Sequence, residues 1–100
     1  MRLALTAALL FSALPAFAAD HAVEIKGMKF VPAAIEVAAG DTITFTNADA
    51  APHTATAGDG AFDTGRLNKG QSATVTVAAA GDHAYVCKIH PMMKGTVTAK

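Results

Sequence analysis

The sequence predicts an all-β protein, a β-sandwich of seven or eight short strands in one domain. Two observations support this prediction. Apolar and polar residues alternate in short runs, which is typical of strands that bury one face. Turn-forming clusters that contain glycine separate these runs at intervals of roughly 8–12 residues, a spacing typical of an antiparallel sandwich or barrel.

The strand patterns can be followed in order along the chain. The alternating runs contain Val23 to Ile25, Ile35 to Val37, Ile43 to Phe45, Ala73 to Val77 and Thr96 to Thr98, and a continuous apolar run at Ala84 to Val86 predicts a further strand. The predicted turns lie at Gly40–Asp41, Gly58–Gly60, Asn68–Gly70 and Gly81–Asp82, whose residue types favour chain reversal. Two alanine-rich pieces are too short to nucleate a helix, so we interpret them as loops or strand ends: 48–51 and 78–80.

Residues 1–18 are expected to be a secretory signal peptide that lies outside the fold. Arg2 gives a positive start, an apolar run at 3–14 is too short to span a membrane, and small residues stand at the two positions a signal peptidase reads, Ala16 and Ala18. Cleavage after Ala18 leaves a single domain of residues 19–100. We therefore expect a periplasmic protein with no membrane anchor.

Charge and cysteine content restrict the function further. Arg2 leaves with the signal, so 7 basic residues (8 − 1) face 8 acidic ones and the net charge is −1. This balance gives no reason to expect a nucleic acid or an anionic membrane as partner, and we expect a monomer. The single cysteine, Cys87, has no partner for a disulfide within the chain. A metal would explain a lone cysteine in an oxidising compartment and would stabilise a small core.

Three candidate metal ligands lie in the short stretch Cys-Lys-Ile-His-Pro-Met-Met, namely Cys87, His90 and Met93. This stretch joins two predicted strands, and its proline argues against a helix. A fourth candidate, His53, lies 34 residues before Cys87 and follows another predicted loop. Loops from different strand pairs gather at one end of a sandwich, so all four side chains can meet there.

One thiolate, two imidazoles and one thioether describe the trigonal copper site used for electron transfer. Zinc usually takes a fourth cysteine, histidine or carboxylate instead of methionine, and iron–sulfur clusters need several thiolates. Met92 is the alternative to Met93, but the spacing from His90 favours Met93. Four protein ligands leave no open position for a substrate, so an enzyme is not expected.

These residues resemble the cupredoxin family, and among its branches the amicyanins most closely, with plastocyanin and pseudoazurin more distant. The similarity covers nearly the whole mature chain and includes Pro52–His53, the Cys87-x-x-His90-x-x-Met93 spacing, Asn47, 28–32 and 40–47. The resemblance implies a Greek-key sandwich with one type 1 copper, held by the four candidates with Met93 axial. It also implies that Asn47 hydrogen-bonds the ligand loops together. Phe45 and Ile89 differ from the tryptophan and proline more frequent in amicyanins.

The leading functional hypothesis is a soluble one-electron carrier that cycles copper between Cu(II) and Cu(I). Its partners would be exported redox proteins: a dehydrogenase, a c-type cytochrome or an oxidase. Ile89, Pro91 and Met92 would form an apolar contact patch beside His90, with two flanking lysines to steer an acidic partner. One alternative is copper delivery or resistance with the same ligands. Another is an exported immunoglobulin-like adhesion domain, which leaves the Cys-His-Met stretch to chance.

The remaining histidines receive separate interpretations. After cleavage the chain would begin Ala19-Asp20-His21, and an amine, two amides and that imidazole can bind Cu(II) or Ni(II) in a square plane. We predict such secondary binding at His21 in vitro. His83 lies about 13 Å along the strand from Cys87 and is expected to be solvated. Tyr85 and three phenylalanines are expected to pack in the core: Phe30, Phe45 and Phe62.

Overall fold

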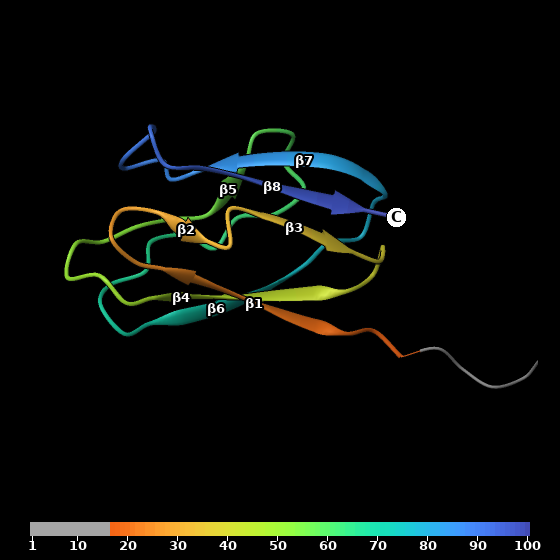
Figure 1. The fold of residues 1–100 in the computed structure, drawn as a ribbon, viewed down its shortest axis with the longest axis horizontal. Coiled ribbons are helices and arrows are strands. Elements are labelled where there is room, and N and C mark those ends of the chain that lie inside the picture. The colour runs from red at the N-terminus through yellow and green to blue at the C-terminus, as the bar shows by residue number, and fades with distance from the viewer. Residues whose placement is uncertain (1–16) are drawn as a thin grey trace, which may run out of the picture.

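The computed structural model describes residues 17–100, which form eight strands in two four-stranded sheets (Figure 1). The predicted β-sandwich of seven or eight strands is therefore confirmed. One sheet contains, in spatial order, β2 (Phe30–Val31), β1 (Asp20–Ile25), β4 (Thr42–Asn47) and β6 (Ser72–Thr76). The other contains β3 (Ala34–Val37), β8 (Lys94–Ala99), β7 (Gly81–Val86) and β5 (Thr56–Ala57). Most of the predicted signal peptide, residues 1–16, lies outside the described residues.

The pairing is mixed, which corrects the expectation of purely antiparallel sheets. β1 pairs with β4 in parallel, β3 pairs with β8 in parallel, and the other pairs are antiparallel. The cause is the path of the chain. After the β1–β2 hairpin it crosses to the second sheet for β3, so β4 returns beside β1 in the same direction.

One predicted turn is also corrected. Gly81–Asp82 begins β7 instead of ending a strand, because both residues pair with Ala99 and Thr98 of β8. Neighbouring strands thus override the local turn preference of this dipeptide. The two alanine-rich pieces at 48–51 and 78–80 lie outside strands and helices, as predicted.

Inward-facing side chains from both sheets form one core. Tyr85 lies at its centre, with ring centroids 4.6 Å from Phe30, 5.5 Å from Phe45 and 5.6 Å from Phe62. These edge-on or tilted contacts suit the charge distribution of aromatic rings and confirm the predicted packing of all four residues. Gly95 of β8 lies directly opposite the Tyr85 ring, where a Cβ atom would overlap the phenol.

The expectation that His83 is solvated is wrong. His83 is only 5% exposed, because it shares the inward face of β7 with Tyr85. Its Nδ1 lies 2.6 Å from a carboxylate oxygen of Asp59, and its Nε2 lies 2.8 Å from the carbonyl oxygen of Ala79. These two acceptors, of which the Ala79 carbonyl has the larger effect, raise the pKa of His83 above its ordinary 6.5.

The loop after β4 and the loop between β7 and β8 lie at the same end of the sandwich, opposite the C-terminus (Figure 1). This arrangement brings the segment that carries His53 to the segment that carries the other three candidates. In the part of the chain described, no helix has the length and apolar character needed to cross a membrane.

Candidate metal centre

Backbone hydrogen bonds fix both segments that carry candidate ligands. His53 exchanges two such bonds with Leu67, at 3.0 and 2.7 Å. In the second segment the Cys87 amide donates to the Met93 carbonyl at 3.1 Å, and the Met93 amide donates to the His90 carbonyl at 2.9 Å. These bonds fix the backbone from which the candidate side chains project.

His53 and Cys87 form the centre of the site, and both are fully buried. Nδ1 of His53 lies 3.7 Å from Sγ of Cys87. The same sulfur accepts a hydrogen bond from the Thr54 amide at 3.3 Å. Two ligand atoms bound to one metal ion by bonds of about 2.0–2.3 Å lie about as far from each other as this imidazole nitrogen and sulfur. The pair thus fits a thiolate and an imidazole on a single ion.

Asp49 determines which nitrogen of His53 faces the thiol. Nε2 of His53 lies 3.0 Å from the Asp49 carboxylate, which can only accept, so Nε2 carries the proton and Nδ1 presents its lone pair to Cys87. The amides of Met28 and Gly27 also donate to this carboxylate, at 2.9 and 2.8 Å. The hydrogen bonds from these amides, that of Met28 having the largest effect, lower the pKa of Asp49 below its ordinary 3.8.

His90 and Met93 lie beside this pair. The rings of His53 and His90 have centroids 5.0 Å apart. Nε2 of His90 is buried and has no hydrogen-bond partner among the described residues, an arrangement that a metal ion would satisfy. Met93 is buried, whereas Met92 is 73% exposed. Across residues 17–100, no three His, Cys, Asp or Glu side chains already converge as a complete cage.

Asn47 braces the first ligand segment. Its Nδ2 donates to the carbonyls of Ala51 and Leu67, both at 2.9 Å, and its Oδ1 accepts from the Asp49 amide. Thr54 joins the two ligand segments by two hydrogen bonds: its amide donates to Cys87 Sγ, and its Oγ1 accepts from the Lys88 amide at 2.9 Å.

Sequence reasoning missed both Asp49 and Thr54. Asp49 could have been found as an acidic residue four positions before a predicted histidine ligand, because such histidines usually donate their second nitrogen to a carboxylate or carbonyl. Thr54 carries no comparable signal, since its role depends on where Lys88 lies in space.

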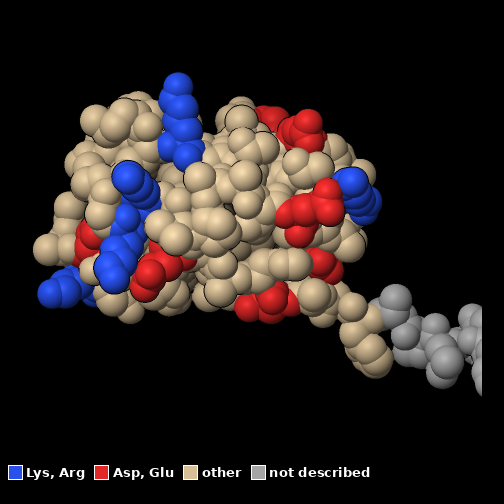
Figure 2. Space-filling view, in the orientation of Figure 1, with Lys and Arg blue, Asp and Glu red and all other residues tan. Residues whose placement is uncertain are grey.

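The surface around the site is apolar and flanked by cations. Ile89, Pro91 and Met92 are exposed. On the face seen in Figure 2, most lysine and arginine side chains gather toward the end that carries the ligand loops, and most carboxylates lie over the other half. Lys88 is exposed, and its Nζ lies 3.9 Å from a carboxylate oxygen of Asp63.

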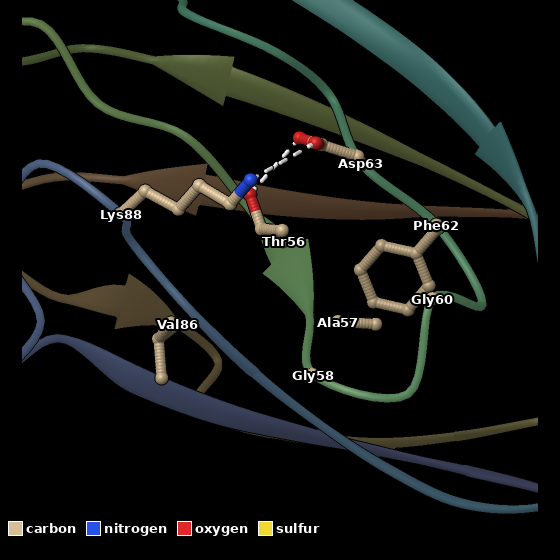
Figure 3. A pocket seen from close by; sticks show the side chains of 8 residues that line it. All are labelled: Thr56, Ala57, Gly58, Gly60, Phe62, Asp63, Val86 and Lys88. Atoms are coloured by element: carbon tan, nitrogen blue, oxygen red, sulfur yellow. Dashed lines mark hydrogen bonds and ion pairs between the residues drawn. The ribbon is translucent and has the colours of Figure 1, made fainter.

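A hollow of about 520 Å³ lies beside this lysine, lined by β5, the segment 58–63 that follows it and the end of β7 (Figure 3). None of the four candidate ligands lines it. Its charged groups pair with one another, since Asp63 accepts from Thr56 and faces Lys88. The hollow is therefore separate from the metal-ligand chemistry.

His21 lies far from these residues and within β1, where it pairs with Ile43 of β4. Its Nε2 is 2.9 Å from Asp41, whose other carboxylate oxygen accepts from the Ala19 amide. Hydrogen bonds from His21, Ala19 and Ala38 lower the pKa of Asp41 to about 2. Square-planar binding at the terminus would require these contacts to open.

Two packed sheets with a thiol, two imidazoles and a thioether at one end define a protein of the cupredoxin class. A family model described as a cupredoxin-like domain matches residues 1–99, and the chain belongs to this family. The family predicted from the sequence is confirmed.

The curated relatives are amicyanins. The chain is 35% identical to amicyanin-alpha of Methylorubrum extorquens, over 95% of this chain and 87% of the relative. It is 32% identical to the amicyanin of Paracoccus denitrificans, over 78% of this chain but only 63% of that protein. The chain thus spans less than two thirds of the length of the Paracoccus denitrificans amicyanin.

Solved structures give the same result. A Cu(I) form of an amicyanin variant has a TM-score of 0.73 and 31% identity, over 81% of this chain and 82% of that chain. A copper-containing nitrite reductase from Thermus scotoductus SA-01 has a TM-score of 0.74 and 29% identity. The match covers 88% of this chain but only 23% of the reductase.

Proposed function

We propose that residues 19–100 form an exported one-electron carrier with one type 1 copper, held by His53, Cys87, His90 and Met93. The observation that carries this proposal is the 3.7 Å separation of His53 Nδ1 and Cys87 Sγ, beside the unpartnered nitrogen of His90. Copper bound there would supply a reversible change between Cu(II) and Cu(I).

The surrounding residues suit the site to rapid electron transfer because they limit movement. The Thr54 amide stabilises negative charge on the Cys87 sulfur. Asp49 holds the His53 ring, and Thr54 Oγ1 joins the two ligand segments through Lys88. Ligand segments fixed by these hydrogen bonds would rearrange little when an electron arrives.

Electrons would enter and leave through the edge of His90. The neighbouring Ile89, Pro91 and Met92 are exposed and uncharged, which suits a brief contact of less than about 1,200 Å². Lys88 and Lys94 would steer an acidic partner, so that the association rate falls as salt concentration rises. The proposed partners are an exported dehydrogenase, a c-type cytochrome or an oxidase.

A carrier is favoured over an enzyme because four protein ligands leave no open position for a substrate. The nitrite reductase does not weaken this argument, since the chain corresponds to only 23% of it. Copper delivery with the same ligands remains the second candidate. A delivery protein would release Cu(I) readily to a competing chelator, whereas a carrier would retain copper through repeated reduction and oxidation.

Export through cleavage after Ala18 gains support from Asp41. The nitrogen of Ala19 lies 2.9 Å from the Asp41 carboxylate. Cleavage would convert this amide to a positively charged amine, which would form an ion pair at the same position. Mass spectrometry of the protein recovered from the periplasm tests the proposal: the chain should begin at Ala19, and an uncleaved chain in the cytoplasm would contradict it.

The secondary N-terminal site at His21 depends on the same cleavage. We propose it only as a binding property in vitro, because β1 must release the terminus first. His21→Ala should abolish nitrogen-type Cu(II) absorption at the terminus and leave the main site unchanged.

The direct test of the proposed function is addition of one equivalent of Cu(II) to the purified mature protein. We expect an intense visible thiolate-to-copper band that ascorbate abolishes and reoxidation restores. Cys87→Ser should abolish the band. Met92→Leu should leave it unchanged, whereas Met93→Leu should shift it, and equal effects of the two methionines would contradict the ligand assignment. A colourless copper complex of the wild-type protein would refute the carrier.

A further inference from the structure

The three methionines other than Met1 line one surface hollow of about 220 Å³. Met28 comes from the β1–β2 turn, and Met92 and Met93 come from the loop between β7 and β8. Their exposure decreases inward: Met92 is 73% exposed, Met28 is 39% exposed and Met93 is 3% exposed. The hollow therefore leads from the surface to the proposed axial ligand.

Met28 occupies a backbone conformation that an unbranched apolar side chain rarely adopts. Its φ is +60° and that of Gly27 is +63°, so the two form the centre of a tight hairpin turn. Glycine, asparagine and aspartate are the residues usually found at such positions. A methionine held in this strained conformation points to a role for its side chain beyond turn formation.

The same turn is connected to the proposed metal centre. The Met28 amide donates to Oδ2 of Asp49, and this oxygen also lies 3.0 Å from Nε2 of His53. Met28 is thus held at a fixed position relative to the ligands, although it lies 25 residues away from His53 in the sequence.

We propose that Met28 and Met92 form a surface thioether site that accepts Cu(I) and transfers it through Met93 to the ligands below. Thioethers are soft ligands that favour Cu(I) over Zn²⁺ or Cu(II). The transfer is a ligand exchange without change of oxidation state, in which the Cys87 thiol loses its proton to solvent as the thiolate binds. This inference rests on the proposed copper function and deepens it by naming the route of metal entry.

The charges at the hollow are consistent with this selectivity. Lys29 and Lys94 also line it. Their ammonium groups repel a divalent ion about twice as strongly as a monovalent one at the same distance, because Coulomb energy scales with charge. They also attract an acidic copper donor.

The test compares metal loading of apo-protein in the wild type and in Met28→Leu/Met92→Leu, which conserves side-chain volume. Cu(I) is supplied as its coloured bicinchoninate complex, and uptake is followed by loss of that colour. We expect Cu(I) loading of the double variant to slow about tenfold or more, a loss typical of removing groups that support a metal site. The final uptake of one Cu(I) should be unchanged, and so should the rate at which added Cu(II) produces the visible band.

Ile89→Leu is the matched control, because Ile89 is as exposed as Met28, at 39%, and does not line the hollow. An unchanged rate of Cu(I) loading in the double variant, or equal slowing with Cu(I) and Cu(II), would refute the proposed entry site without affecting the proposed copper function. Failure of the wild type to take up copper would refute the proposed function instead.

A second measurement does not depend on the variants. One equivalent of Ag(I), a redox-inert soft ion, is first added to wild-type apo-protein to fill the main site, and further Ag(I) is then added while the methionine methyl NMR signals are recorded. The signals of Met28 and Met92 should shift together in this second stage. Second-stage additions that leave these two signals unchanged would overturn the proposal.

Discussion

Removal of the Asp49 carboxylate should weaken copper binding and fold stability together. Three donors converge on this group: the amides of Gly27 and Met28 and Nε2 of His53. Asp49→Ala removes all three hydrogen bonds. At about 1 kcal/mol net for each bond, the free energy of unfolding of the apo-protein should fall by about 3 kcal/mol. The unanchored His53 ring should reduce copper affinity by about 10–100-fold.

Asp49→Asn provides an intermediate case. Asparagine has one carbonyl oxygen, and its amide nitrogen can only donate. If the oxygen faces Met28 and His53, one bond is lost, at the exposed Gly27 amide. The expected cost is about 1 kcal/mol, which corresponds to a decrease in Tm of about 4–8 °C for a domain of this size. Copper affinity should remain near that of the wild type, because His53 keeps its acceptor.

Asp63→Ala is the control for these variants. Asp63 also accepts two hydrogen bonds, from Gly65 and Thr56, and faces Lys88. Among the described residues it makes no hydrogen bond or ion pair with a proposed ligand, so its loss should lower stability and leave copper affinity unchanged. The measurements are thermal unfolding of the apo-proteins and competition for Cu(I) with a chelator. Equal copper affinities for Asp49→Ala and Asp63→Ala would refute the reasoning.

Three further predictions concern the core. His83 has a raised pKa, and the neighbouring charges are Asp59 and Asp82. Its contribution to stability should therefore be complete below pH 6.5 and should decrease as pH rises through the folded-state pKa. His83→Gln should remove this dependence from Tm measured against pH. Gly95→Ala should lower the free energy of unfolding by about 1–3 kcal/mol or prevent folding, because the new methyl group overlaps the Tyr85 ring; an unchanged urea midpoint would contradict this. Tyr85→Phe should raise stability by about 1 kcal/mol in urea unfolding, because the buried hydroxyl has no partner among the described residues, and a decrease would show that it has one.

The sequence predicted those features of the fold that depend on neighbours in the chain. Strands of four or more residues show alternation or, in β7, an apolar run, so β1, β3, β4, β6, β7 and β8 were all anticipated. β2 and β5 contain two residues each, too few to show a period. The parallel pairs were not predicted, because spacing along the chain does not determine which sheet a strand joins. His83 was misjudged because the polarity of a side chain does not reveal a buried partner such as Asp59.

The candidate site likewise contains one part that depends on local sequence and one part that depends on contacts between segments. The ligand spacing Cys87-x-x-His90-x-x-Met93 is local and could be read directly. The groups that hold His53 lie outside this loop: Asp49 four residues before His53, the Gly27–Met28 turn that fixes Asp49, and the backbone of Leu67. The Cys87–Met93 loop supplies three of the proposed metal ligands, but the hydrogen bond to Nε2 of the fourth, His53, comes from Asp49 outside the loop. Transfer of that loop alone to another sandwich would therefore not reproduce the site, because the His53 nitrogen that faces the thiol is selected by a carboxylate fixed to the opposite sheet.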